Sequence, residues 1–310
     1  MEGSPALQLS GIVNTHNHVQ TINEVKKIFS FYYPQSGFKK IQKVYTLVKK
    51  LFEGKFPGYR ECNTQYHDFR HTLDALLASA RILDGYNLCH TPIPENTARN
   101  LFIAALLHDT GYIQESWDTE GTGAKYTKNH VLRSVEFTRK NYGELGLDIQ
   151  DVPEITQFIQ CTGLSTNFNE IPFMSRAHKI CGACLGTADL LGQMADREYL
   201  EKLLFLYYEF REAGVPGYDT EFDIIKKTED FYMLTRNRLK DSYMNVQRYT
   251  KNHFSTRYHI NSNLYMISIN RHIRYLRKII RDETTNFRHK LKRGDQHMLH
   301  ALSQQPPTHH

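Results

Sequence analysis

The sequence predicts an all-α protein. Five apolar residues recur at steps of three and four, which is the period of one buried helix face: Leu73, Leu76, Leu77, Ala80 and Leu83. A second stretch, Leu101–Leu107, carries no charge and suits a buried helix. Almost none of the chain shows the apolar–polar alternation that is typical of strands.

Length and composition predict a protein with a real core and no membrane span. The 310 residues are 40% hydrophobic and 12% aromatic, and no run of eighteen apolar residues occurs. Residues Met1–Pro5 lack the basic-then-apolar pattern of a signal peptide. The five cysteines are an odd number in a sizeable chain and favour reduced thiols, so we expect a cytoplasmic protein.

We expect four parts along the chain. Residues 1–20 form an N-terminal tail, 21–250 the main helical domain, 251–293 a basic helical extension packed on that domain, and 294–310 a disordered tail. In the first part, His16 and His18 follow a short strand-like run, as metal ligands do in amidohydrolases. That fold needs a repeated strand–helix alternation, which is missing here, so we interpret both histidines as surface or tail residues.

The elements of the main domain follow from apolar periodicity and from breaker residues. Residues 22–55 predict two helices separated by Pro34–Gly37, and residues 198–250 predict further long helices. Between them, residues 87–96 form a loop, and the polar residues 114–128 form a longer loop that we expect at the rim of a site.

We interpret the basic extension and a CxxC pair as structural features without a binding or catalytic role. From Lys240 to Arg293 there are thirteen Lys and Arg against three Asp and Glu, a net charge of +10. No aromatic-interleaved motif accompanies these charges, so we expect a solvated helix and no nucleic-acid binding. Cys181 and Cys184 lie in an apolar stretch without a second cysteine pair, which favours small core thiols over a zinc or redox site.

Histidines and carboxylates gather at the two ends of the stretch 66–109. His67 and His71 are four residues apart, so on a helix they share one face. His108 and Asp109 end the apolar run 101–107; adjacent side chains on a helix diverge by about 100°, and Thr110–Gly111 supplies a break that lets both reach one ion. A buried imidazole beside a carboxylate is costly unless it is compensated, and a metal ion is the usual compensator.

This pattern resembles a known family. His71, then His108–Asp109, then Asp189 looks like the H…HD…D signature of HD-domain metal-dependent phosphohydrolases. More narrowly, Tyr66–His71 followed by an apolar run into His108–Asp109 is similar to the catalytic domain of cyclic nucleotide phosphodiesterases, which carries YHNxxHA and then HD.

The resemblance continues in order over roughly residues 25–245. It includes Asn129–His130 before an apolar helix, Ile159–Thr162, Ala188–Leu190, and Glu209–Phe210 ahead of Gly214. The resemblance implies an HD-type helical bundle as the catalytic domain.

The resemblance also implies roles for the site residues. The metal ligands would be His71, His108, Asp109 and Asp189, with Asp109 able to bridge to a second ion. His67 would be the catalytic proton donor, and Tyr66, His130 and Thr162 would face a second metal or the substrate. The ligand types suit one or two divalent ions of Zn, Mn, Fe or Mg.

Two positions depart from the phosphodiesterase pattern. Lys128 stands two residues before His130, where those enzymes carry a glutamate; Asp118 or Glu120 could substitute for it. The segment Thr228–Lys240 contains no glutamine, whereas phosphodiesterases recognise the base with a late-helix glutamine.

The predicted function is therefore metal-dependent hydrolysis of a small phosphate ester or nucleotide. A phosphodiester, with a cyclic nucleotide as one instance, is the first expectation. The alternatives are a nucleotide phosphomonoesterase of the HD group and a non-catalytic nucleotide-binding sensor. No membrane partner is expected, and the sequence leaves the oligomeric state open.

Overall fold

A computed structural model describes residues 9–282, 284 and 286–291. This part of the chain forms eleven α-helices: α1 (His18–Phe29), α2 (Gln35–Phe52), α3 (Phe69–Asn87), α4 (Glu95–Leu107), α5 (His130–Leu145), α6 (Val152–Gln160), α7 (Arg176–Ala195), α8 (Tyr199–Glu212), α9 (Glu221–Asn237), α10 (Tyr249–Tyr258) and α11 (Leu264–Arg281). Within the described ranges no strand is present, so the predicted all-α class is confirmed. No described helix is long and apolar enough to cross a membrane.

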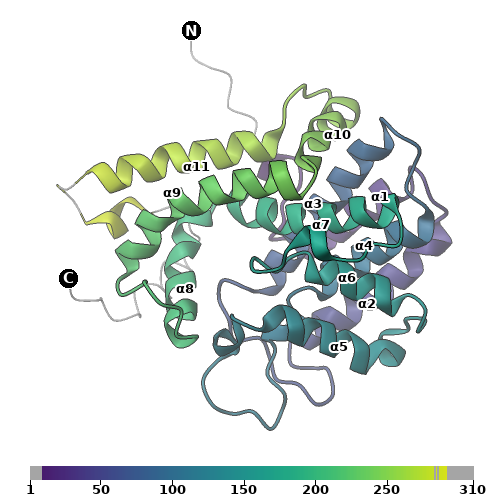
Figure 1. Ribbon diagram of the computed structural model, residues 1–310, viewed down its shortest axis with the longest axis horizontal. Coiled ribbons are helices and arrows are strands. Elements are labelled where there is room, and N and C mark those ends of the chain that lie inside the picture. The colour runs from purple at the N-terminus through teal and green to yellow at the C-terminus, as the bar shows by residue number, and fades with distance from the viewer. Residues whose placement is uncertain (1–8, 283, 285, 292–310) are drawn as a thin grey trace.

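The helices α3 and α7 lie at the centre of the molecule (Figure 1). Helices α1, α4, α10 and α11 pack around this pair, and α2, α5 and α6 complete the side next to α4. The long helices α9 and α11 run side by side at the opposite end, above α8 (Figure 1). The predicted apolar faces form the core: Leu76, Ala80 and the whole run Leu101–Leu107 are buried.

Helix boundaries follow the local sequence. Asp68 caps α3, because its carboxylate accepts a hydrogen bond from the backbone N–H of His71 at 2.7 Å. Thr220 and Asp223 form a reciprocal capping box at the start of α9. Gly146 ends α5 in the left-handed conformation, at φ 71°, which glycine adopts without strain.

The structure shifts the predicted boundaries between the segments of the chain. Helix α1 begins at His18, inside the range assigned to a tail, and Val13 is buried ahead of it. The boundary between 250 and 251 falls inside α10, and both α10 and α11 pack on the main helices. The thiols of Cys181 and Cys184 are buried in α7, as predicted. The predicted disordered tail at 294–310 lies outside the described residues.

Candidate metal centre

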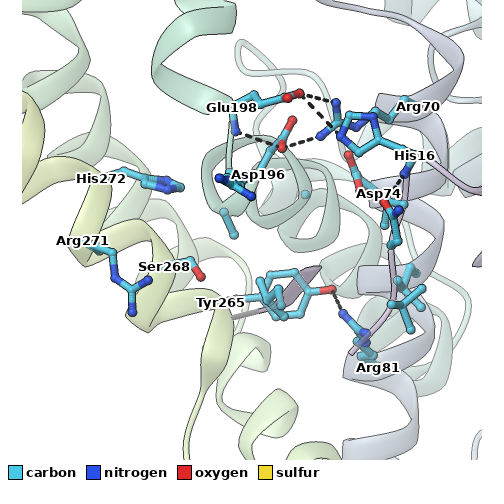
Figure 2. Close-up of a pocket in the computed structure, with 18 residues that line it drawn as sticks. His16, Arg70, Asp74, Arg81, Asp196, Glu198, Tyr265, Ser268, Arg271 and His272 are labelled. Atoms are coloured by element: carbon cyan, nitrogen blue, oxygen red, sulfur yellow. Dashed lines mark hydrogen bonds and ion pairs between the residues drawn. The ribbon is translucent and has the colours of Figure 1, made fainter. Parts of the chain in front are cut away.

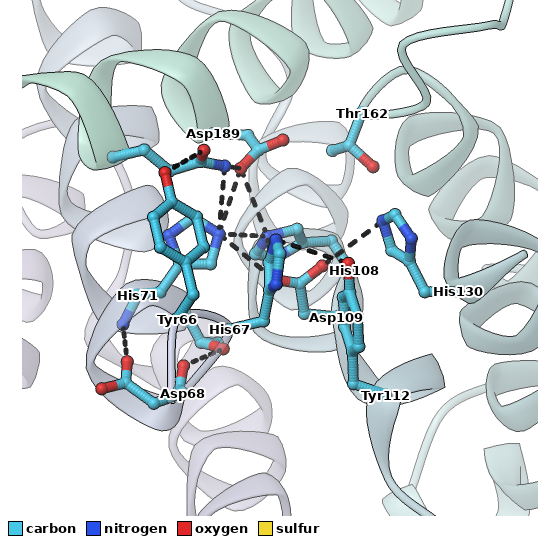
Figure 3. Close-up of polar contacts among 12 residues, drawn as sticks. Tyr66, His67, Asp68, His71, His108, Asp109, Tyr112, His130, Thr162 and Asp189 are labelled. Carbon is cyan, nitrogen blue, oxygen red and sulfur yellow. Dashed lines mark hydrogen bonds and ion pairs between the residues drawn. The ribbon is translucent and has the colours of Figure 1, made fainter. Parts of the chain in front are cut away.

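Three helices bring the predicted ligands together (Figure 3). His71 lies in the first turn of α3, His108 is the C-cap of α4, and Asp189 lies in the middle of α7. After His108 the helix ends: Asp109 has φ −109° and ψ 9°, and a short 3₁₀ turn, η2 (Thr110–Tyr112), follows. This break turns the Asp109 carboxylate toward the same point as the His108 ring, as the sequence predicted.

The ligand atoms lie within a few ångströms of one another. His71 Nε2 is 3.1 Å from Asp109 Oδ2 and 3.1 Å from Asp189 Oδ1. His108 Nε2 is 3.3 Å from Asp109 Oδ2, 3.7 Å from Asp189 Oδ1 and 3.3 Å from His71 Nε2. Ligands bonded to one ion at about 2.1 Å are about 3.0–3.4 Å apart in octahedral or tetrahedral geometry. His71, His108 and Asp109 could therefore hold one metal ion, with Asp189 beside them.

The hydrogen bonds around the cluster favour a cation. His108 Nδ1 donates to the carbonyl of Ala105 at 2.8 Å, which leaves the lone pair of Nε2 for the cluster. Asp109 Oδ2 is buried and accepts no well-aligned hydrogen bond from the described residues, although His71 Nε2 and His108 Nε2 lie 3.1 and 3.3 Å away. A buried carboxylate oxygen in this state is costly unless a positive charge compensates it.

The imidazoles and carboxylates of the cluster shift one another's pKa values. Burial alone would lower the pKa of His71, but Asp109 and Asp189 raise it to about 9 and also raise the pKa of His108. Burial would raise the pKa of Asp109 and Asp189, yet the two imidazoles hold both well below their usual range. The two carboxylates therefore favour positive charge at this point, which protons or a metal ion supply.

Three rings are stacked beside the cluster. Tyr112 lies between His67 and His130, with ring centroids 4.2 and 4.6 Å away. His67 Nδ1 donates to Glu209 Oε2 at 2.6 Å, and its Nε2 is 3.4 Å from the Tyr112 hydroxyl. His67 thus lies next to the ligands, held by a carboxylate, without belonging to the ligand set (Figure 3).

His130 approaches the cluster from α5. Its Nδ1 donates to the carbonyl of Thr127 at 2.8 Å, and its Nε2 is 3.8 Å from Asp109 Oδ1. Burial lowers the pKa of His130, so the neutral ring, with a lone pair on Nε2, is favoured. This position suits a ligand of a second ion or of a bridging water.

The cluster opens into a cavity of about 690 Å³. Asp109, His67, His130, Tyr66 and Thr162 all line it, so the predicted second-metal or substrate residues reach the same space. Much of the remaining wall is apolar: Leu203, Leu206, Phe210, Ile224 and Phe231. Its size suits a small ligand.

The comparison with family models adds one match. Residues 116–270 match the model of the Npun_R2479-like family, which is half of the chain. The chain belongs to the Npun_R2479-like family. No curated protein and no solved structure matches it. The region shared with the Npun_R2479-like model contains His130, Asp189 and Glu209 and begins after His71, His108 and Asp109.

Sequence reasoning did not predict Gln193 and Tyr112 as site residues of this Npun_R2479-like chain. Gln193 Nε2 donates to Asp189 Oδ1 at 2.7 Å, and its Oε1 accepts from the Tyr66 hydroxyl at 3.1 Å. The signal was its spacing, because Asp189 and Gln193 are four residues apart on one face of α7. Tyr112 carries no comparable signal, since its stacking depends on helices distant in sequence.

Lys128 lies in the wall of the same cavity. Its Nζ donates to the carbonyl of Gly214 at 2.7 Å and thereby ties the loop before α5 to the end of α8. Asp118, a predicted substitute for the missing glutamate, forms an ion pair with Lys125 at 2.5 Å, accepts a hydrogen bond from Tyr126, and does not line the cavity. Glu120 does not line it either.

Proposed function

We propose that the chain is a metal-dependent phosphohydrolase that cleaves a small phosphodiester. The observation that carries this proposal is the buried cluster of His71, His108 and Asp109, with Asp189 beside it, at the floor of a cavity large enough for a small molecule. A cyclic nucleotide is one candidate substrate, although the absence of a glutamine from Thr228–Lys240 removes the base contact that the phosphodiesterase resemblance implies.

The four ligand residues would hold a divalent ion of Zn, Mn, Fe or Mg, and His130 could contribute to a second one. Such an ion lowers the pKa of a bound water and neutralises charge on the phosphate oxygens. Asp109 Oδ2 and the Nε2 atoms of His71 and His108, which lie within 3.3 Å of it, fit this role.

His67 would donate the proton to the leaving oxygen. Glu209 accepts a hydrogen bond from His67 Nδ1 at 2.6 Å, which fixes the orientation of the ring. Because His67 lines the cavity beside Asp109, its Nε2 can reach a substrate bound over the cluster.

The test combines elemental analysis with hydrolysis of bis(p-nitrophenyl) phosphate in the presence of Mn²⁺. We expect stoichiometric metal and turnover in the wild type, and loss of both in Asp109→Ala. Asp148→Ala, at an exposed carboxylate paired with Lys40, is the matched control and should keep both. Wild-type metal content in Asp109→Ala would refute the ligand assignment.

One observation supports a non-catalytic sensor as the second candidate. Lys128 stands where the phosphodiesterases carry a glutamate, and a cation cannot orient a metal-bound hydroxide as a carboxylate does. A sensor would bind nucleotide without turnover with any of the four metals.

Product analysis distinguishes a phosphomonoesterase from a phosphodiesterase, because free phosphate is released only from a monoester or polyphosphate.

A further inference from the structure

A second cavity of about 710 Å³ lies between α3, α11 and the segment that joins α7 to α8 (Figure 2). Among the residues that the structure describes, none lines both this cavity and the one at the candidate metal cluster. Its walls carry many charges, and three of them form one network with His16. Arg70 donates to Asp196 at 2.6 Å and to Glu198 at 2.5 Å, and His16 is 3.7 Å from Glu198.

Arg81 is a buried charge in these walls that has no carboxylate partner among the described residues. It lines this cavity, its side chain is 2% exposed, and no carboxylate of the described residues lies within 4.0 Å of its guanidinium. Its Nη1 donates to the Tyr265 hydroxyl at 3.1 Å, and the group lies over the Phe254 and Tyr265 rings at 5.3 and 5.8 Å. These neutral partners compensate a buried charge only in part.

Two nitrogen atoms of the Arg81 guanidinium have hydrogen-bond donors that remain unused in the described ranges. Nε and Nη2 are buried and have no hydrogen-bond partner among the described residues. These two nitrogens form one edge of the guanidinium, and their parallel N–H groups bind two oxygens of a single carboxylate or phosphate. Arg271, on the facing helix α11, lines the same cavity and also has no ion pair within the described part of the chain.

We propose that this cavity binds a small molecule through an oxyanion group, a phosphate or a carboxylate, held on the Nε–Nη2 edge of Arg81. Arg271 adds positive charge on the opposite wall. Asp74 lies two helical turns before Arg81 on α3, roughly 10 Å along the axis, and offers acceptors for hydroxyl or amino groups of the same ligand.

The experiment titrates inorganic phosphate, and separately acetate, into the full chain in EDTA and follows the unfolding temperature and the heat of binding. We expect at least one anion to stabilise the wild type, and Arg81→Met to weaken that binding at least about tenfold. The anion that binds more tightly identifies the group. Arg139→Met, at an exposed arginine of α5, is the matched control and should bind as the wild type does.

The Arg81→Met variant is expected to fold, and a second variant is available if it does not. Replacing an unpaired buried cation by an apolar side chain of similar length should leave the anion-free protein at least as stable as the wild type. If Arg81→Met fails to fold, Ser268→Asp places a negative charge in the same cavity at a half-buried position and should abolish binding.

Asp109→Ala separates this cavity from the metal cluster. Loss of anion binding in Asp109→Ala but not in Arg81→Met would overturn the proposal. It would also be overturned if neither anion stabilised the wild type, or if Arg81→Met and Ser268→Asp bound as the wild type does.

Discussion

The contacts of His67 distinguish it from His71, although the sequence spacing would allow either histidine to bind a metal. It is one turn before His71, and either histidine could have been a ligand. In the structure its Nδ1 is bound by Glu209 and its ring is stacked on Tyr112, so that it faces the cavity beside the ligands. Held in this way, the ring suits proton transfer better than metal binding.

We expect His67→Gln to lower kcat on bis(p-nitrophenyl) phosphate by about 10²–10⁴-fold, because glutamine cannot donate a proton to the leaving oxygen. Metal content, measured by elemental analysis, should stay at the wild-type level. His90→Gln, outside the cavity, is the control. If His67→Gln lost its metal instead, His67 would be a ligand and the role given to it here would be wrong.

Asp74 provides a pH-dependent prediction. Burial, together with the nearby Asp196 charge, raises the pKa of Asp74 to about 6, although Arg70 and Lys202 oppose the shift. Because the folded chain holds this proton more tightly than the unfolded chain, the stabilising contribution is complete below about pH 4 and is lost as the pH rises toward 6. Asp74→Asn should therefore gain stability relative to the wild type between pH 5 and pH 7.

Urea unfolding at the two pH values measures this difference. The free energy of unfolding of Asp74→Asn, relative to the wild type, should be higher at pH 7 than at pH 5. An equal difference at both values would show that Asp74 does not titrate in this window.

At the scale of elements, the contact between η2 and α5 positions His130. Gly111 packs so closely on α5 that a Cβ atom there would lie 2.0 Å from the His130 carbonyl oxygen and 2.8 Å from the Ser134 backbone nitrogen. The Gly111 N–H donates to Ser134 Oγ at 2.8 Å, and Ser134 Oγ donates to the His108 carbonyl at 2.6 Å. The end of α4 and the start of α5 are thus joined next to His108.

Gly111→Ala should lower the free energy of unfolding by about 1–3 kcal/mol, since the added methyl group must push α5 away. The same displacement should reduce turnover more than metal content, because His130 moves while His71 and His108 stay. Chemical denaturation and elemental analysis measure the two effects. Gly143→Ala, within α5 with open space around the glycine, should be neutral or stabilising; an equal loss there would contradict the packing argument.

At the scale of the whole molecule, the sequence predicted the all-α class because its signals are local. The apolar steps through Leu73–Leu83 and the breaks near Pro34 and at Thr91–Pro94 depend only on neighbouring residues, and helices are present on both sides of each break. The first break was placed too late, because α1 ends at Phe29 and Gln35–Gly37 already belong to the first turn of α2. The meeting of His71 with His108 and Asp109 was predicted through motif order and is reproduced by the packing of α3 on α4.

The features of the site that the sequence did not predict depend on contacts between distant segments. The stacking of Tyr112 between His67 and His130, and the bond from Gln193 to Tyr66, arise from the relative placement of α3, α5 and α7. The unpaired edge of Arg81 could likewise not be predicted from the sequence, because only the fold shows that no carboxylate within the described ranges contacts it.

A bound ion should stabilise the whole fold. At a free concentration one hundred times its Kd, an ion that binds only the folded chain adds about 2.7 kcal/mol to the free energy of unfolding. Scanning calorimetry should therefore show a lower unfolding temperature after chelation of the wild type, and no change on chelation of Asp109→Ala. A wild type that is insensitive to chelation would argue against a tightly bound ion.

The origin of the candidate ligands on three separate helices has a mechanical consequence. His71 and Asp189 are 118 positions apart in the chain, on the two helices at the centre of the molecule. An ion shared between them would act as a cross-link that closes a long loop, much as a disulfide does, but one that forms and opens with the supply of metal. Backbone amides of α3, the end of α4 and α7 should then exchange their hydrogens together, more slowly when the cross-link is in place.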